Sequence, residues 1–275
     1  MGRADSVPIL YRPAWPLGRF VKTIWYYEGY TQPHAFERLM PDGSMGVVIN
    51  LDDDRVRIYE SENLTKFRLL EGAIFMGAQT EFFIIDTAEQ RNVIGAQFAA
   101  GGAFPFLDAP AGELEGLHVS VGDLLPAEHR RIRERLLEIP SPVERCRQFE
   151  RELLAMAAGR MEIRADVAYA AKALDDPARS VADVAACSGL SSRRLTQVFR
   201  DAVGLTPKAY SRVRRFQRAL RGLQSPEAPD WVEIALDCGY YDQSHFNNDF
   251  REFSGIVPSE YVAVKTPHLN HVPLG

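Results

Sequence analysis

The sequence has no long apolar run and very little cysteine, and both shortages narrow the class of protein. Its densest apolar stretches, such as residues 82–85, are strand-length, whereas a membrane span needs roughly 18 apolar residues. The N-terminus lacks the apolar core of a signal peptide. Cys146, Cys187 and Cys238 form no CxxC pair and lie in apolar periodic segments, a pattern typical of buried thiols in a reducing compartment. We therefore expect a soluble cytoplasmic protein.

The motifs of the common enzyme classes are also missing. There is no GxGxxG, Walker A or GxSxG pattern, and the β-rich N-terminal region lacks the His-x-His grouping that metal-dependent barrel enzymes use. His268 and His271 form a pair on a proline-flanked tail, without carboxylate or cysteine neighbours in the sequence. We therefore expect neither an enzyme nor a cofactor or metal site.

The charge is unevenly distributed along a chain of otherwise ordinary composition. The 275 residues are 46% hydrophobic and 25% charged, which is typical of a globular protein long enough for two domains. The net charge of −5 hides a contrast. Residues 193–221 hold nine Lys or Arg against one Asp, a local charge of +8, and residues 225–263 hold one Arg against eight acids, a local charge of −7. The basic segment is either a solvated helix face or a surface that attracts a phosphate backbone.

The predicted secondary structure changes along the chain, and the overall class is α+β. Runs of β-branched and aromatic residues, separated by turn signals, extend to about residue 105 and favour a small barrel or sandwich over a doubly wound sheet. They lie at 20–27, 46–51, 55–59, 73–76, 82–86 and 93–98. Helices are predicted over 124–138 and 143–158. We place one domain at 1–160, a helical domain at 162–264 and a tail at 265–275.

The helix predicted at 143–158 carries one apolar stripe. Val143, Cys146, Phe149, Leu153 and Ala157 lie three or four residues apart, so they share a face. The stripe predicts either a contact between two copies of the chain, which would form a homodimer, or a cover over the β-rich region.

The C-terminal hundred residues contain an internal repeat. Residues 184–190 match 234–240, and six later positions match at an offset of 51 residues. Each copy predicts a helix, a glycine-containing turn and a second helix, which is either a DNA-reading helix-turn-helix or an αα-hairpin used only for packing. A basic connector helix is predicted at about 207–223 and would span roughly 25 Å. This length is suited to holding the second helix of each copy about one DNA turn apart.

This repeat resembles the AraC/XylS family of bacterial transcription regulators over about residues 164–264. The matching positions of the first copy are Ala185, Ser188, Gly189, Leu190, Ser191, Leu195, Phe199, Gly204, Pro207, Tyr210, Arg215 and Ala219. Those of the second are Ile234, Ala235, Cys238, Gly239, Tyr240, Gln243, Ser244, His245, Phe246, Phe250, Gly255, Pro258 and Tyr261. The N-terminal region resembles a regulatory domain found fused to this module, which implies a cupin-like barrel by analogy.

The resemblance implies double-stranded DNA as a partner, with RNA polymerase as a further one. Arg, Gln, Asn and Thr suit base edges in the major groove, and basic side chains suit phosphates. The positions that match the family's base-reading residues are Arg193, Thr196, Gln197, Gln243, Ser244, His245 and Asn248. The expected phosphate contacts are Arg194, Arg200, Arg212 and Arg215.

Simpler roles remain open for several of these residues. Gln243 and His245 could cap or pack a helix, Arg193 could contact phosphate rather than a base, and Arg200 and Arg212 could be helix-packing partners. From the charge contrast we expect the first copy to dominate binding strength. The acidic second copy would mainly fix the position of the protein along the DNA. Its acidic side chains would point away from DNA or toward RNA polymerase.

The N-terminal domain has two competing interpretations. Aromatic residues and two polar residues near a turn could form an effector pocket, or each could simply pack in the core; they are Trp25, Tyr27, Phe75, Phe83, Arg38 and Asp42. Alternatively, the domain serves only dimerisation or protein contact, without a ligand. A DNA-repair methyl acceptor fused to this module is excluded, because the first 145 residues contain no cysteine to hold its zinc.

Overall fold

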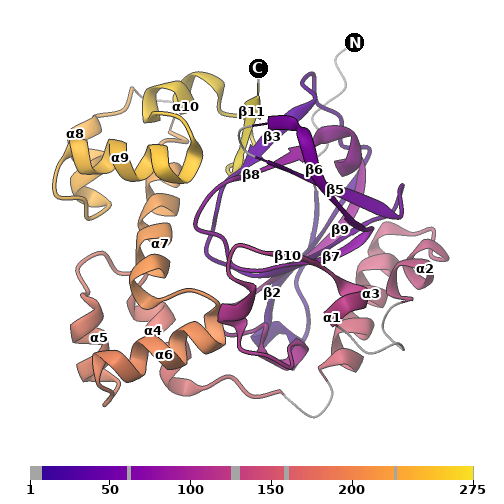
Figure 1. The fold of residues 1–275 in the computed structure, drawn as a ribbon, viewed down its shortest axis with the longest axis horizontal. Helices are drawn as coiled ribbons and strands as arrows, with labels where there is room; N and C mark the ends of the chain where they lie inside the picture. The colour runs from indigo at the N-terminus through magenta and orange to yellow at the C-terminus, as the bar shows by residue number, and fades with distance from the viewer. Residues whose placement is uncertain (1–7, 61–62, 125–130, 158–160, 226–227, 275) are drawn as a thin grey trace.

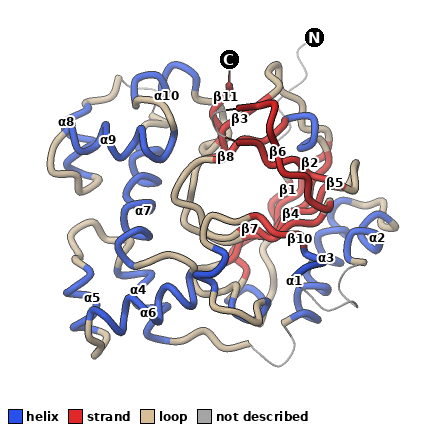
Figure 2. Tube along the Cα trace, viewed as in Figure 1, coloured by secondary structure: helices blue, strands red, loops and turns tan. Residues whose placement is uncertain are grey.

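The computed structural model describes residues 8–60, 63–124, 131–157, 161–225 and 228–274. An N-terminal β-rich domain is flanked by helices on one side and by a helical C-terminal domain on the other (Figure 1). The described strands form two antiparallel sheets, without closing into a single barrel (Figure 2). The sandwich alternative of the sequence analysis is therefore the correct one.

Each sheet contains strands that are distant in the sequence. The six-stranded sheet has the order β1 (Ile9–Tyr11), β2 (Val21–Glu28), β9 (Asn92–Phe98), β4 (Gly46–Asn50), β7 (Ala73–Met76), β10 (His118–Ser120). The five-stranded sheet has the order β11 (His271–Leu274), β3 (Phe36–Leu39), β8 (Phe83–Asp86), β5 (Arg55–Glu60), β6 (Asn63–Glu71).

The six strands predicted from β-branched and aromatic runs are all present, within one or two residues of the expected bounds. The prediction missed β1, β3, β6, β10 and β11. Most of these are very short, and β6 is largely exposed on both faces, so it shows no alternation of apolar and polar residues. The tail is the main correction, because residues 271–274 pair antiparallel with β3 instead of hanging free.

Three helices follow the strands of the N-terminal domain: α1 (Val121–Leu124), α2 (Ile132–Leu137) and α3 (Pro142–Met156). Residues 125–130, in the middle of the helix predicted at 124–138, lie outside the described residues, as does the boundary proposed near residue 160. In α3 the predicted stripe is buried in the chain's own core, except Val143, which is 44% exposed. The stripe therefore covers the six-stranded sheet and is not free for a dimer contact.

The C-terminal domain consists of two helix-turn-helix units on a common connector. Its helices are α4 (Ala165–Ala173), α5 (Val181–Cys187), α6 (Ser192–Val203), α7 (Pro207–Gly222), α8 (Trp231–Asp237), α9 (Gln243–Ser254) and α10 (Pro258–Val264). Ser191, Thr206 and Asp242 accept a backbone N–H and so cap the starts of α6, α7 and α9. The repeat and its connector helix are confirmed. No helix in the described part of the chain is both long and apolar enough to span a bilayer.

The prediction of three buried thiols is wrong for Cys187, which is exposed. Cys187 is the last residue of the short helix α5, whose buried positions are Val184 and Ala185. Cys187 lies two positions after Ala185, a spacing at which helical side chains do not face the same way, and it is exposed to solvent.

The two domains share their hydrophobic cores. One core joins the six-stranded sheet and α3 to the first helix-turn-helix, including Leu195 and Phe199. A second core joins α7 and the second helix-turn-helix to Met40 and to Val272 of the tail strand. Each helix-turn-helix is therefore packed against a different part of the sandwich.

Candidate nucleic-acid interface and cavity

The helices α6 and α9 have the same orientation relative to the sandwich. Each ends in a left-handed glycine, with φ of +93° at Gly204 and +74° at Gly255. A Cβ on Gly204 would stand 3.2 Å from Ala78, and one on Gly255 would stand 2.7 Å from the Phe82 ring. Because both C-terminal ends dock on the sandwich, both N-terminal ends extend away from it (Figure 1). The N-terminal end of a recognition helix is the part that contacts base edges.

The first set of predicted base-reading residues lies at the free end of α6. Arg193, Arg194 and Gln197 are exposed. Thr196 is half-buried, and its hydroxyl donates to the Ser192 carbonyl oxygen at 2.8 Å. The arginine and glutamine side chains are thus available to a partner, while the threonine hydroxyl is already engaged.

The second set lies at the free end of α9, with one exception. Gln243, Ser244 and Asn248 are exposed. His245 is half-buried, contacts the Tyr240 ring edge-on at 5.2 Å, and has its Nε2 3.9 Å from the Asp249 carboxylate. This arrangement favours the packing role for His245.

Tyr241 was missed by the sequence analysis. It occupies the turn before α9 and is 87% exposed. Tyr241 directly precedes the cap of α9, beside the predicted base-reading residues, and the adjacent aromatic pair 240–241 was the available signal.

Most of the predicted phosphate contacts are engaged within the protein. Arg212 donates to Asp249 at 2.8 Å and to Glu252 at 2.7 Å, which raises the pKa of its guanidinium through hydrogen bonds with these carboxylates. Arg215 donates to the Gly239 carbonyl oxygen at 3.0 Å and stacks on the Tyr240 ring. Arg200 contacts Glu115 and the backbone of the 3₁₀ turn at 111–114.

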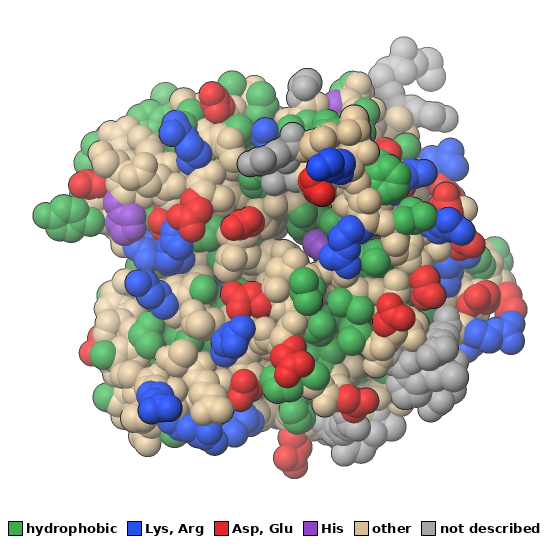
Figure 3. Space-filling model, in the orientation of Figure 1, with side chains coloured by type: hydrophobic (Ala, Val, Ile, Leu, Met, Phe, Trp, Pro, Cys, Tyr) green, Lys and Arg blue, Asp and Glu red, His purple; other side chains and the backbone are tan. Residues whose placement is uncertain are grey.

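The opposite charges of the two copies therefore attract one another through the connector. The basic α7 pairs with acids of α9, so part of the +8 stripe neutralises part of the −7 segment. Figure 3 shows Lys and Arg side chains at the left edge and lower left, over the region of α5 to α7, and others over the right half of the molecule. Arg194 and Arg200 are the predicted phosphate contacts that stay exposed, and Arg200 also pairs with Glu115 at 3.3 Å.

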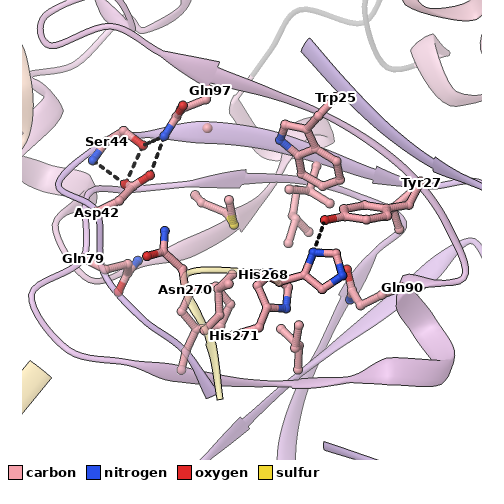
Figure 4. A pocket seen from close by; sticks show the side chains of 18 of the residues that line it. Trp25, Tyr27, Asp42, Ser44, Gln79, Gln90, Gln97, His268, Asn270 and His271 are labelled. Carbon is pink, nitrogen blue, oxygen red and sulfur yellow. Dashed lines mark hydrogen bonds between the residues drawn. The ribbon is translucent and has the colours of Figure 1, made fainter. Parts of the chain in front are cut away.

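A cavity of about 350 Å³ lies between the two sheets. Its walls are mainly apolar and include Trp25, Tyr27, Leu39, Met40, Met45, Val48, Val56, Ile58, Ile74, Met76, Phe83, Ile85 and Val93. Polar side chains gather toward one end, where Asp42 accepts hydrogen bonds from Ser44 and Gln97 (Figure 4). Tyr27 and His268 meet at another part of the wall, 3.0 Å apart.

Four of the six residues predicted for an effector pocket line this cavity: Trp25, Tyr27, Asp42 and Phe83. Phe75 and Arg38 do not line it. Side chains alternate along a strand, so Ile74 and Met76 face the cavity while Phe75 points into the core on the other side of the sheet. Arg38 alternates in the same way with Leu39 and stacks on Phe82 outside the cavity.

The tail was missed as part of the cavity. His268, Leu269, Asn270 and His271 all line it, although they follow the last helix of the C-terminal domain. The histidine pair has no carboxylate neighbour in the sequence, but in the structure His271 Nδ1 lies 2.7 Å from Glu37. No spacing signal in the tail could have indicated this pairing across more than 200 residues.

Glu37 is a fully buried carboxylate that holds the tail in place. It accepts hydrogen bonds from the Tyr30 hydroxyl at 2.9 Å and lies 2.7 Å from both His34 and His271. Burial acts to raise its pKa, but the hydrogen bonds from His271, His34 and Tyr30 outweigh burial and lower the pKa to about 2. Glu37 is therefore ionised at neutral pH.

Two protein families match the chain. Residues 184–263 match a helix-turn-helix domain family, and residues 10–120 match a domain of unknown function (DUF6597). The HTH-type transcriptional activator AarP of Providencia stuartii is 35% identical over 82 residues, which are 30% of this chain and 60% of AarP. The chain thus matches less than two thirds of that relative's length.

Two solved structures show a weaker likeness. An AraC-type regulator from Chromobacterium violaceum is 27% identical, with a TM-score of 0.35 over 38% of this chain and 94% of its own. ToxT from Vibrio cholerae is 12% identical, with a TM-score of 0.45 over 89% of this chain and 97% of its own. These scores do not establish a shared overall fold. The similarity to known regulators is thus concentrated in the double helix-turn-helix at the C-terminal end of the chain, where residues 184–263 match a helix-turn-helix domain family.

Proposed function

We propose that the protein is a sequence-specific DNA-binding transcription regulator. The observation that carries the proposal is the common orientation of α6 and α9. Both helices present exposed polar residues at their free N-terminal ends, and α7 joins them over 16 residues, about 24 Å. Two such helices on one rod suit successive major grooves on one face of a duplex.

We expect the full chain to prefer the promoter beside its own gene over random DNA of equal length. Because five of the nine basic side chains in the described segment 193–221 are engaged within the protein, we expect about four phosphate contacts, which would make the affinity fall roughly 100-fold between about 50 and about 200 mM salt. Fluorescence anisotropy at several salt concentrations measures both properties. Equal affinity for the promoter and for random DNA would reject the proposal.

Arg193 and His245 should contribute unequally to DNA affinity. Arg193→Ala is expected to cost about 1–3 kcal/mol of binding free energy and to relax preference at one base pair, because arginine can bridge guanine O6 and N7. His245→Ala should cost less, since His245 already packs within its own motif. Binding titrations of both variants at one fixed salt concentration measure this, with Arg151→Ala on the distant helix α3 as control. A larger loss for His245→Ala would contradict the expectation.

The cavity favours an effector over a purely structural N-terminal domain. Its volume of about 350 Å³ lies within the range of small-molecule sites, and its apolar walls with a few convergent polar groups are typical of them. The protein-interaction interpretation of the domain offers no reason for such a cavity. A regulator of this kind would sense a small molecule in the sandwich and respond at α6 and α9.

RNA polymerase and a second copy of the chain remain proposed partners. Glu233 and Asp237 on α8 are exposed and free for a basic partner surface. A homodimer would have to use a surface other than the buried stripe of α3. We expect the full chain to sediment as a dimer at about 10 µM, a concentration typical for transient association, and a strict monomer there would argue against it.

A further inference from the structure

We propose that the cavity binds a largely apolar small molecule whose polar group is uncharged or cationic, and that α7 senses this molecule through Gln217. The proposal rests on the proposed function of a regulator with an effector cavity. It names the chemical class of the effector and the residue that transmits its presence.

The charge of the cavity wall excludes an anionic ligand. None of the described residues that line the cavity is Lys or Arg, whereas two carboxylates, Asp42 and Glu89, do line it. Glu89 is paired with Arg57 at 2.6 Å. Asp42 receives hydrogen bonds only from neutral side chains, Ser44 and Gln97. An anion would be desolvated beside this carboxylate without a cation to offset the cost.

The basic side chains near the cavity, Arg214, His268 and His271, are engaged with other groups, and His268 meets the Tyr27 hydroxyl through its Nδ1 at 3.0 Å. Arg214 donates to the backbone oxygen of Asp42 from the α7 side, and its guanidinium forms an ion pair with Asp175 at 2.6 Å. His271 faces Glu37. A neutral or cationic group, by contrast, can donate directly to the Asp42 carboxylate at the polar end of the cavity (Figure 4).

The remaining walls suit an apolar body. Trp25, Tyr27 and Phe83 supply ring faces, and Met40, Met45 and Met76 supply flexible thioether side chains that adjust to an irregular shape. A ligand that buries its apolar part here gains most of its binding free energy from these walls, while the polar end fixes its orientation.

Gln217 connects this cavity to the connector helix. Its side chain is 3% exposed, and its amide donates to the Pro41 carbonyl oxygen at 2.8 Å and to Asn270 Oδ1 at 2.9 Å. Pro41 and Asn270 both line the cavity. A single buried amide on α7 therefore holds the turn at 41–44 and the tail at the same time.

The turn at 41–44 packs directly on the same helix. A Cβ on Gly43 would stand 3.4 Å from Val213 and 3.5 Å from Tyr210, which are ordinary van der Waals distances, so the turn lies directly beside α7. A ligand that hydrogen-bonds Asn270 competes for one partner of Gln217, and a ligand on Asp42 binds next to Pro41, the other partner. Because α7 carries both helix-turn-helix units, a rearrangement of these partners changes the relative placement of the two units.

The ligand class is tested with two matched series of probes on the full chain. The indole series is tryptophol, tryptamine and indole-3-acetate, and the alkyl series is decanol, decylamine and decanoate. Calorimetric titration should show the alcohol or amine binding more than about tenfold tighter than the carboxylate in at least one series. Asp42→Asn should remove the preference for the amine, and Ile58→Trp should abolish binding by filling the cavity. Tightest binding by a carboxylate, or binding by none of the six, would overturn the ligand class.

The transmission is tested with the tightest probe and Gln217→Met, which keeps the length of the side chain and removes its hydrogen bonds. In the wild type the probe should change DNA affinity at least about fivefold. In Gln217→Met the probe should still bind, but the change in DNA affinity should fall below about twofold. Gln224→Met, just beyond α7 and away from the cavity, is the matched control and should retain the full change.

Failures of the two proposals are distinguishable. DNA binding without any probe tests the proposed function alone, and calorimetry without DNA tests the ligand class alone. A wild-type protein that binds both the probe and its promoter, with no change in DNA affinity, would overturn the role of Gln217. A Gln217→Met protein in which the probe still changes DNA affinity as much as in the wild type would also overturn the role of Gln217.

Discussion

Replacing Arg212 by Ala is expected to lower the free energy of unfolding by about 2–4 kcal/mol, because it leaves a buried carboxylate without its cation. Asp249 is 5% exposed, and its carboxylate is held by Arg212 at 2.8 Å. Arg212 is itself partly exposed, which places the effect toward the lower end of the range for buried pairs. Chemical denaturation measures the change, and DNA affinity should fall with it as the second helix-turn-helix loosens from α7.

The double variant Arg212→Ala with Asp249→Asn separates this structural role from a phosphate contact. Removing the buried charge should restore much of the stability, and DNA affinity should recover in parallel. If Arg212 instead acted as a phosphate contact alone, Arg212→Ala would weaken DNA binding at unchanged stability. The second substitution would then restore nothing, and this result would refute the structural role.

Replacing Glu37 by Ala should cost about 2–4 kcal/mol of unfolding free energy, because its buried hydrogen-bond donors lose their acceptor. Tyr30, His34 and His271 all converge on this carboxylate. The loss also frees the tail strand β11 from β3, so the C-terminal residues should become sensitive to proteases. Thermal unfolding and limited proteolysis measure the two effects, with the exposed Glu28→Ala on β2 as control.

The same carboxylate predicts a dependence of stability on pH. Folding lowers the pKa of Glu37 from its ordinary value of 4.5 to about 2, so its contribution is complete above pH 4.5 and is lost as the pH falls toward 2. The slope over this window is roughly 1.4 kcal/mol for each pH unit. Glu37→Gln should flatten the wild-type curve there. An identical slope in both proteins would show that Glu37 is not the group responsible.

Local features of the chain were predictable because short-range physics decides them. The spacing of Cys146, Phe149 and Leu153 is sufficient to predict a helix with one buried face, and the β-branched runs are sufficient to predict six strands. The repeat was visible because equivalent residues recur at a fixed offset. Capping residues such as Ser191 and Thr206 also mark helix starts locally.

The candidate DNA-reading ends of α6 and α9 were likewise identifiable from the sequence, but the use of the arginines was not. A cluster of basic residues has the same pattern whether it meets phosphate or a neighbouring helix. Only the packing of α9 on α7 places Asp249 and Glu252 beside Arg212. Whether a charge is free or paired depends on what lies opposite it, which composition does not encode.

The cavity was the least predictable feature, because its walls come from distant parts of the chain. Aromatic residues such as Trp25 and Phe83 indicated an apolar interior, but not whether the interior was filled. The sequence by itself determined six of the strands, the helix α3 and the double helix-turn-helix, whose signals repeat over a few residues. The tertiary structure alone decided that the tail closes the sandwich and that Gln217 reaches Pro41, since these contacts join residues more than 170 positions apart.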